Sequence, residues 1–474
     1  MAIEPFSLSS DLPEFQDTVP RTDIRKEGDF YLDKVELIAY NGKTYGLELL
    51  RLELSIHEDI FNHTMSGALH FQDSSDLTQF LPLIGEEKLK ISFTRPSEEG
   101  RGLLDEYFEM EFRVYKIDHR RPEGDKFNIQ NYVLYFVSQE RINDMKKKVW
   151  RTYKDMPYSV MANQVFDEYL ESSKPLDVET SMYDFKFAAS GLSPFQILTI
   201  LAARSISSEG NGSGYLFYED MDKFNFTSIG RLLKQESEIK YISQMSNILE
   251  SKNDPGGYRD RDIEADVRRV ENYRFSSSFD VLARMQRGMY AQQLLAVDDL
   301  RQVWESHDWD YKKEFPKLPH IDVGDVHTDS LDALGSPQTV LRMMTTTKDH
   351  DQVAHIVARE PGIKPNHIEE YILKRACQLE VMANNRLHIN VSGDPRRRVG
   401  KVIEFELPNH YGAVSEHHRP DPPHDRYLSG KYLITSLKHR IEAHKYYCEM
   451  EIVKDTFAQD IEHVDVIDQQ MFSW

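Results

Sequence analysis

The chain has 474 residues, a length that excludes one small domain and corresponds to about three domains of ordinary size. It carries 79 acidic and 58 basic residues, and the resulting formal net charge of −21 disfavours sequence-independent binding to a nucleic-acid backbone. Hydrophobic residues make up 40% of the chain and aromatic residues 11%, which is enough to build packed cores and excludes general disorder.

The two cysteines, Cys377 and Cys448, are too few for a disulfide framework or a thiolate zinc site. Both lie in patterned apolar segments, so we predict that both are core residues. The N-terminal residues do not combine a basic segment with an apolar run, and no window approaches the roughly 18 apolar residues of a membrane span. We therefore expect no membrane span and synthesis in a reducing cytosol.

The first part of the chain is predicted to be rich in strands. Residues 1–28 contain three prolines and no sustained periodicity, which indicates an extended arm. From Leu50 to His57 apolar and polar residues alternate, and the same period recurs in later segments as far as residue 142. Strands separated by polar turns, without amphipathic helices between them, predict an antiparallel β-barrel over residues 29–142. We expect residues 214–232 to complete it.

Residues 143–374 are predicted to form a mixed helical insertion, because the period changes near residue 150. Ser193-Pro194 is typical of an N-cap followed by proline at the first helical position. The glycine-rich run 210–214 precedes an aromatic segment with a central turn, which predicts a hairpin. Residues 235–269 are polar and alternate arginine with acidic residues, so we expect a mobile surface loop there.

Period-two alternation returns in the last part of the chain. Alternating segments over residues 375–458 predict a second antiparallel β-barrel, and residues 459–474 are a C-terminal tail. The predicted fold class is therefore α+β and mainly β, with two β-barrel domains and a helical and hairpin insertion between them.

The two β blocks share short phrases. Gly85 and Gly400 each precede an alternating strand, and the pairs Ser66-Gly67 and Ser429-Gly430 each open one. Such matches are consistent with a structural duplication. They are also short enough to arise by coincidence, so both interpretations stay open.

Longer phrases resemble a known family. The run Ile56–Phe93, IHEDIFNHTMSGALHFQDSSDLTQFLPLIGEEKLKISF, looks like the signature of the central baseplate hub proteins of contractile-tailed bacteriophages. Residues 386–408 and 427–455 are similar to the C-terminal tube-like domain of these proteins, and residues 278–300 resemble their middle region. The resemblance rests on a series of phrases in the right order and includes no catalytic motif.

The resemblance implies a structural role. In that family each subunit resembles two fused tail-tube protomers, so a homotrimer has six tube-like positions and acts as a symmetry adapter between a six-fold tail tube and a three-fold central spike. It further implies tape measure and baseplate wedge proteins as partners, a place in the virion baseplate, and assembly in the host bacterial cytoplasm. DNA would pass through the channel without specific binding. The acidic balance suits such a conduit, although it is equally the charge of an ordinary soluble surface.

Eight residues are predicted to contact another subunit or a partner. Tyr411, His417 and His418 lie in a long loop between two predicted strands, and in tube-like proteins such loops pack on the neighbouring subunit. The loop's histidines and aspartates could also bind a transition metal. Because Pro420, Pro422 and Pro423 impose an extended loop, we favour packing and predict no metal.

The other predicted contacts are a basic run and an apolar tip. Arg396, Arg397 and Arg398 lie in a predicted turn that faces other subunits in the family, so intersubunit salt bridges are expected; a solvated turn is the alternative. Phe472 and Trp474 give an otherwise polar tail an apolar end, which we expect to bind a partner.

No catalytic residue and no cofactor are predicted. His57, Glu58 and His63 lack the spacing of a zinc-protease helix, and the run 210–214 is not followed by the Lys-Ser/Thr of a phosphate-binding loop. In the family, peptidoglycan cleavage belongs to the separate spike polypeptide. Two alternatives remain: a peptidoglycan-degrading baseplate component with a hydrolase in residues 143–330, and a hub or spike scaffold of a non-phage contractile injection system.

Overall fold

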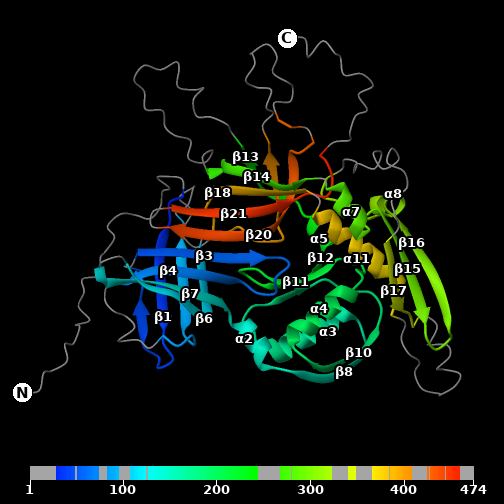
Figure 1. The fold of residues 1–474 in the computed structure, drawn as a ribbon, viewed down its shortest axis with the longest axis horizontal. Helices are drawn as coiled ribbons and strands as arrows, with labels where there is room; N and C mark the ends of the chain where they lie inside the picture. The colour runs from blue at the N-terminus through cyan, green and yellow to red at the C-terminus, as the bar shows by residue number, and fades with distance from the viewer. Residues whose placement is uncertain are drawn as a thin grey trace, which may run out of the picture.

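The protein consists of two β units and two insertions (Figure 1). The structure is a computed structural model. It describes residues 28–48, 51–73, 83–95, 107–123, 126–243, 267–278, 280–322, 340–347, 366–383, 385–407, 424–425, 427–442 and 445–458.

The first β unit is formed by seven strands near the N-terminus. In the fourth of them Leu69 and Phe71 are buried whereas His70 is exposed, which is the pattern of a strand with one face on a core. The unit is followed by a short helix, α2 (Gln139–Lys146). Its strands are β1 (Tyr31–Ile38), β2 (Thr44–Gly46), β3 (Arg51–Asp59), β4 (Ser66–Asp73), β5 (Lys88–Thr94), β6 (Tyr107–Glu123) and β7 (Lys126–Ser138).

The second β unit takes its strands from two separate parts of the sequence. In its last strand Cys448, Met450 and Ile452 are buried and alternate with half-buried polar residues, as the sequence predicts. The first two strands come from the middle of the chain and the other four from its C-terminal part. They are β13 (Ser237–Ile242), β14 (Val270–Ser278), β18 (Asn385–Ser392), β19 (Val402–Glu406), β20 (Gly430–Glu442) and β21 (Lys445–Val453).

The two β units join edge to edge through β20 and β3. Residues 436–441 of β20 pair antiparallel with residues 54–59 of β3, and Figure 1 shows the two strands side by side. The thirteen strands of the two β units therefore form one sheet among the described residues, in the order β14-β18-β21-β20-β3-β4-β7-β6-β5-β1-β2, with β19 beside β20 and β13 beside β19. A continuous core of buried apolar side chains lies on this sheet.

Both units have the same strand order, which is a structural duplication. The order is β3-β4-β7-β6-β5-β1 in the first unit and β14-β18-β21-β20-β19-β13 in the second. Corresponding strands even share a bulge, between Val114 and Lys116 in β6 and between Ile434 and Ser436 in β20. Only the last pairing differs, because β1 runs antiparallel to β5 whereas β13 runs parallel to β19.

One of the two short sequence matches falls on corresponding strands. β5 follows Gly85 and β19 follows Gly400, and both glycines adopt a positive φ, 85° and 75°, that favours glycine. The other match does not reflect the duplication. Ser66-Gly67 opens β4, whose counterpart is β18, whereas Ser429-Gly430 opens β20.

The first insertion follows the first β unit and has its own apolar core. Its best-defined helix begins as predicted: the Ser193 side chain accepts from the Gln196 backbone, the Gln196 side chain accepts from the Ser193 backbone, and Pro194 occupies the first helical position. The elements are α2, β8 (Val149–Met156), α3 (Tyr158–Val165), the π-helix η1 (Phe166–Leu170), β9 (Leu176–Val178), β10 (Phe185–Leu192), α4 (Pro194–Arg204), β11 (Tyr215–Glu219), β12 (Phe224–Ser228) and α5 (Ile229–Leu233).

The hairpin β11–β12 does not complete the first β unit, in contrast to the expectation for residues 214–232. It pairs with β9 in a separate three-stranded sheet. The strand β11 is buried on both faces, with Leu216 and Tyr218 in the core of the large sheet and Tyr215 and Phe217 in the core of the insertion. Its apolar residues therefore fasten the insertion to the β units without adding strands to them.

The second insertion lies between β14 and β18 and forms a third core. Its strand β15 pairs antiparallel with β16 and parallel with β17, and Figure 1 shows this sheet beside the longest helix at one end of the molecule. The elements are α7 (Val281–Arg287), β15 (Ala291–Asp298), β16 (Val303–Asp310), α8 (Tyr311–Glu314), the 3-10 helix η2 (Phe315–Lys317), β17 (Val340–Thr345) and α11 (Ile368–Met382).

The predicted boundaries of the insertion need correction. The range 143–374 is two insertions, because β13 and β14 between them return to the second β unit. β13 lies inside the range 235–269 that was expected to be a surface loop, and position 375 falls within α11. The polar composition of β13 has a physical cause: it is a strand whose Glu238 and Lys240 point to solvent while Tyr241 is buried.

Two simpler predictions concern the cysteines and the membrane. Cys377 and Cys448 are free and buried, so both are core residues as predicted. Among the described residues, no helix is both long enough and apolar enough to cross a membrane.

Candidate assembly interface

The junction between β3 and β20 shows how one β unit of this protein binds another. Leu54 lies opposite Ile441, and Ile56 lies opposite His439. These four side chains are buried, so the two sheets share a core across the junction. On the other face the Arg440 guanidinium reaches across to Glu53, with 2.8 Å between Nη2 and Oε1.

A buried ion pair lies inside this junction. Glu58 of β3 is 0% exposed and His439 of β20 is 1% exposed, and the distance from His439 Nε2 to Glu58 Oε1 is 3.6 Å. Neither of these two atoms has a hydrogen-bond partner within the described ranges, so each faces only the other. The remaining polar atoms are occupied: His439 Nδ1 lies 2.7 Å from the Tyr446 hydroxyl, and Glu58 Oε2 accepts from the Val399 backbone N–H at 3.3 Å.

The charge of the pair follows from its surroundings. Burial by itself lowers the pKa of His439, but the Cys448 sulfur and the Glu58 carboxylate act in the opposite direction, and the pKa rises to about 9. His57, the neighbour of Glu58 on the other face of β3, behaves differently: burial and the Lys438 ammonium lower its pKa to about 4. At neutral pH the junction thus holds a charged histidine on its buried face and a neutral one on the other.

A second buried charge cluster links the two units. Asp394, which follows β18, is ion-paired with Arg397 at 2.9 Å and Arg396 at 3.0 Å, and Arg95 at the end of β5 lies 3.6 Å from the same oxygen. Burial alone would raise the pKa of Asp394. The guanidinium groups of Arg397, Arg396 and Arg95 instead hold this pKa well below its usual range.

The arginine run predicted to meet another subunit therefore has partners inside the chain. Arg397 is buried against Asp394, and Arg396 shares that carboxylate while staying half-exposed. Arg398 forms an ion pair with Asp222 of the first insertion, with 2.9 Å between Nε and Oδ2. A contact of these arginines with a neighbouring subunit stays a prediction, and the ion pairs supply the structural role that sequence reasoning assigned to a partner.

The other predicted contact residues lie outside the described residues: Tyr411, His417, His418, Phe472 and Trp474. Within the described residues, His367, Glu369 and Glu370 bring possible metal-ligand atoms within 4.8 Å of one another. The ring of His367 stacks on Tyr183 with 3.9 Å between centroids, and Tyr183 donates to Glu370 at 3.1 Å. These contacts tie α11 to the first insertion.

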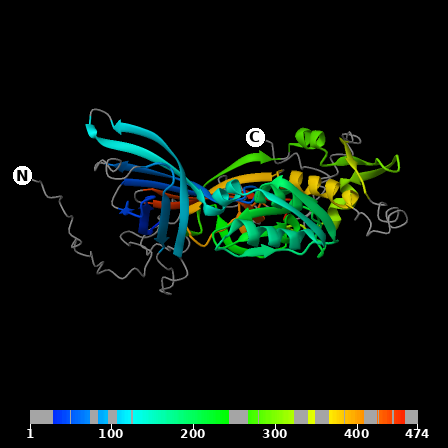
Figure 2. The ribbon, with the colours of Figure 1, turned by 90° about the horizontal axis from the view of Figure 1, so that it is seen from below.

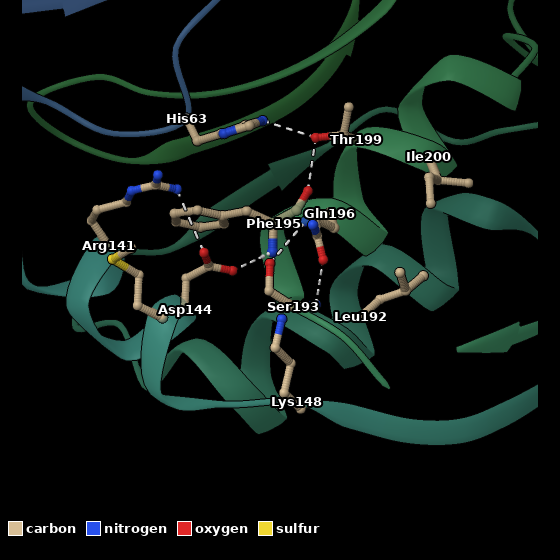
Figure 3. Close-up of a pocket in the computed structure, with 11 residues that line it drawn as sticks. His63, Arg141, Asp144, Lys148, Leu192, Ser193, Phe195, Gln196, Thr199 and Ile200 are labelled. Atoms are coloured by element: carbon tan, nitrogen blue, oxygen red, sulfur yellow. Dashed lines mark hydrogen bonds and ion pairs between the residues drawn. The ribbon is translucent and has the colours of Figure 1, made fainter. Parts of the chain in front are cut away.

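A cavity of about 590 Å³ lies where the turn after β3 meets α2 and α4 (Figure 3). Figure 3 shows Arg141 and Asp144 of α2 facing the first turn of α4, with His63 above it. Asp144 accepts from the Phe195 backbone N–H at 2.7 Å, and the His63 ring stacks on the Phe195 ring with 5.2 Å between centroids. The cavity thus marks the place where the first β unit and the first insertion are held together.

The polar groups of this cavity are engaged with one another and with the backbone of α4. Thr199 donates its hydroxyl proton to the Phe195 carbonyl at 2.7 Å, so His63, 2.9 Å away, must donate to the Thr199 oxygen. A catalytic base would have to accept from that hydroxyl instead. Burial, followed by the charge of Arg141, lowers the pKa of His63 and keeps the ring neutral. Asp144 is occupied by the α4 backbone and by Arg141.

Comparison with known proteins gives one sequence relative and a set of structural neighbours. No protein-family model matches the chain. Over 190 residues the chain is 22% identical to the probable baseplate hub protein gp334 of Vibrio phage KVP40, a match that covers 40% of this chain and 43% of that protein. The 43 kDa tail protein of prophage MuSo2 from Shewanella oneidensis aligns with a TM-score of 0.50 and 12% identity over 90% of this chain and 99% of that chain. A tail protein from Neisseria meningitidis MC58 aligns with a TM-score of 0.48 and 8% identity over 89% of this chain and 96% of that chain.

The fold is therefore that of a phage tail protein, mainly β with large antiparallel sheets. The resemblance to the baseplate hub family that the sequence indicates is confirmed by the relative from Vibrio phage KVP40. The matched segment spans less than half the length of that relative.

Sequence reasoning missed the charged residues that meet across the junction. Nothing in the sequence around Glu58 or around His439 indicates that the two side chains pair. A short signal for the duplication was nevertheless present. Residues 117–120 read IDHR and residues 437–440 read LKHR; Ile117 and Asp118 occupy the positions of Leu437 and Lys438, and a bulge in β6 shifts the residues that follow by one.

Proposed function

We propose that the protein is a structural subunit of a contractile-tail baseplate hub, in which three copies form a ring between a six-fold tail tube and a three-fold central spike. The observation that carries the proposal is the duplication of the β unit within one chain. Three copies present six β units, so the ring can match a six-fold surface on one side and a three-fold surface on the other. The β3–β20 junction supports this arrangement, since it already joins two units edge to edge.

The ring would form the end of the channel through which the genome leaves the virion. The net charge of −21 supports this role, because a lumen that carries carboxylates repels DNA phosphates and lets the strand pass without binding. Edge-to-edge joining also hides strand edges that would otherwise aggregate. We place the protein in the tail baseplate after assembly in the host cytoplasm, with the tube and spike proteins as direct partners and the tape measure and wedge proteins as further partners.

We propose no catalytic role. Most residues that line the cavity at α2 and α4 belong to the range 143–330 in which a hydrolase was considered, and His63, from the first β unit, donates to the hydroxyl that a base would have to deprotonate. Incubation of the purified chain with peptidoglycan is expected to release no soluble fragments. Released fragments would favour the alternative of a peptidoglycan-degrading component. A non-phage contractile injection system would use the same fold, and the genes beside this one would distinguish the two settings.

The mass in solution tests the proposed ring. The chain has a mass of 55.4 kDa, so a trimer has a mass of about 166 kDa. We expect this trimer either for the purified chain or after addition of the spike protein, measured by light scattering on a sizing column. A chain that stays monomeric with both spike and tube proteins present would refute the proposal.

A further inference from the structure

The duplication identifies two strand edges that correspond to the β3–β20 junction but have no strand partner among the described residues. One edge of β20 has two partner strands: residues 430–433 pair with β19 and residues 436–441 pair with β3. The corresponding edge of β6 has one described partner strand. Residues 107–113 pair with β5 on this edge, whereas residues 116–123 pair only with β7, on the opposite edge. β14, the counterpart of β3, pairs only with β18 and ends the sheet.

A backbone hydrogen bond marks the same place on the two edges. The Val114 N–H donates to the Glu87 carbonyl at 2.9 Å, and at the same place in the second unit the Ile434 N–H donates to the Lys401 carbonyl at 2.9 Å. Beyond these hydrogen bonds β20 continues into its contact with β3. In β6, no described strand occupies the same stretch.

Residues that lie directly opposite one another on neighbouring strands form a row across the sheet. Comparing such rows shows which position of the first unit corresponds to which position of the second. One row crosses four strands of the first unit through Ile117, Leu134, Leu69 and Leu54. The corresponding row of the second unit passes through Leu437, Met450, Ile389 and Tyr273. Position 54 of β3 therefore corresponds to position 273 of β14, and position 117 of β6 corresponds to position 437 of β20.

We propose that β6 of one copy pairs antiparallel with β14 of the next copy, in the register that β20 and β3 show within the chain. Inside the chain Arg440 lies opposite Ser55 and Ile441 lies opposite Leu54. In β6 a bulge between Asp118 and Arg121 inserts one extra residue, so Arg121, which pairs with Asn131, takes the place of Arg440, which pairs with Tyr447. Translated in this way, Arg121 lies opposite Arg274 of the neighbouring copy and Pro122 lies opposite Tyr273. This inference rests on the proposed trimer and specifies the strands that close it.

Apolar side chains on both edges pack on the large core, so this core can continue across a β6–β14 contact. In β14, Tyr273 and Phe275 are half-buried against the large core, whereas Arg274 and Ser276 are exposed. In β6, Ile117 also packs on that core. Figure 2 shows the β6–β7 hairpin, drawn in cyan, projecting from the body of the molecule. A second copy is the occupant that fits, because the occupant of the corresponding edge inside the chain is the same kind of strand.

The contact joins two different surfaces and therefore generates a ring when its rotation closes. In a trimer, three β3–β20 junctions within the chains alternate with three β6–β14 junctions between them. All six joints then use corresponding strands, which is how three identical chains can build a ring with nearly six-fold symmetry.

Cysteine cross-linking tests the register in the full-length chain. Directly opposite residues of an antiparallel pair have Cα atoms about 4.5–5.5 Å apart, within the range that a disulfide spans. The variant Arg121→Cys/Arg274→Cys should give covalent dimers and trimers on oxidation with diamide. The matched control Ser55→Cys/Arg440→Cys places the same pair in the internal junction and should give an intramolecular disulfide without covalent oligomers.

Further controls address the direction and the register of the contact. Each single variant, Arg121→Cys or Arg274→Cys, should give no covalent oligomer, because the two edges differ. The pair Arg121→Cys/Asn272→Cys lies diagonally, at about 7–8 Å, and should cross-link much less. A single variant that cross-links, or a diagonal pair that cross-links as well as the direct pair, would overturn the proposed register.

The outcomes separate this inference from the proposed function. A trimer by mass that does not cross-link through Arg121→Cys/Arg274→Cys, although the internal control pair does, would refute the β6–β14 contact and leave the trimer standing. A chain that stays monomeric with spike and tube proteins refutes both. Covalent trimers from the double variant, together with no covalent oligomers from the two single variants, support both the β6–β14 contact and the proposed trimer.

Discussion

Removal of the buried carboxylate in the β3–β20 junction should weaken the joint between the two β units. The substitution Glu58→Gln keeps the size of the side chain and an oxygen that can still accept from the Val399 backbone. It removes the negative charge that faces His439 at 3.6 Å. Without that charge, the Cys448 sulfur is the remaining group that raises the pKa of His439, so this pKa falls.

The pKa of His439 sets an upper bound on the magnitude. At about 1.36 kcal/mol per pKa unit, deprotonation at pH 7 of a histidine with a pKa of about 9 costs about 2.7 kcal/mol. Because Cys448 and Glu58 both raise this pKa, with Cys448 first, we expect Glu58→Gln to lower the free energy of unfolding by a part of this amount, about 1–2 kcal/mol at pH 7. Because the folded-state pKa lies above the value of about 6.5 in the unfolded chain, the contribution is fully present below about pH 6.5. It is lost as the pH rises through about 9.

Equilibrium urea denaturation of the two chains at pH 7 and at pH 9.5 measures this effect. The matched control is Glu53→Gln, which lies on the same strand and removes the surface ion pair with Arg440 from the same junction. An exposed pair of this kind contributes about 0–1 kcal/mol, with little change between the two pH values.

Two results would contradict the reasoning. One is an equal loss of stability in Glu58→Gln and Glu53→Gln at pH 7. The other is a loss in Glu58→Gln that stays the same at pH 9.5, since the wild-type pair should by then have lost its proton.

Two further predictions concern buried groups. The substitution Asp394→Asn removes the buried carboxylate that Arg397 contacts at 2.9 Å and leaves Arg397 the more distant Glu238 at 3.6 Å, so it should cost about 3–5 kcal/mol in the free energy of unfolding. The control Asp222→Asn changes a carboxylate that is largely exposed in its ion pair with Arg398 and should cost about 1 kcal/mol or less. Urea midpoints check both, and equal effects would contradict the burial argument. In Gly67→Ala the new Cβ would lie 2.3 Å from a backbone oxygen and 2.4 Å from an aromatic ring, so we expect a loss of about 1–3 kcal/mol from overpacking. In Gly42→Ala the Cβ meets open space, so a positive φ of 79° leaves only about 1–2 kcal/mol of backbone strain. A thermal denaturation series in which Gly42→Ala is the less stable of the two would refute this ranking.

The duplication explains why the domain organisation is only partly visible in the sequence. Residues of β4 and β18 hold the same place in the two units, yet their sequences, SGALHFQD and NRLHINVS, share little beyond alternation. Alternation is what a half-buried strand requires, and many different residues satisfy it. Segments with a special backbone need, such as the turn at Gly85 and the one at Gly400, are more constrained and were recognisable.

The errors in the predicted boundaries have a common physical origin. β13 was assigned to a surface loop because its outward residues are charged, and the hairpin β11–β12 was assigned to the first β unit because an aromatic hairpin is expected to return to a sheet. Side-chain polarity reports how deeply a strand is buried and not which strand it pairs with. The partner of β13 lies more than a hundred positions away, as the pair Lys240 and Glu404 of β13 and β19 shows.

The sequence by itself determined the local structure of this protein: alternating strands in two blocks, helices where the period changes, the N-cap at Ser193, and the resemblance to baseplate hub proteins. These features depend on short-range periodicity and on turn chemistry, which neighbouring residues encode. Only the tertiary structure decided that β20 joins β3, that Glu58 meets His439, and that one edge of β6 and one of β14 lack a described partner strand. Those facts arise from strand pairing between residues separated by hundreds of positions, where the shared core and the backbone hydrogen bonds, and not the local pattern, select the partner.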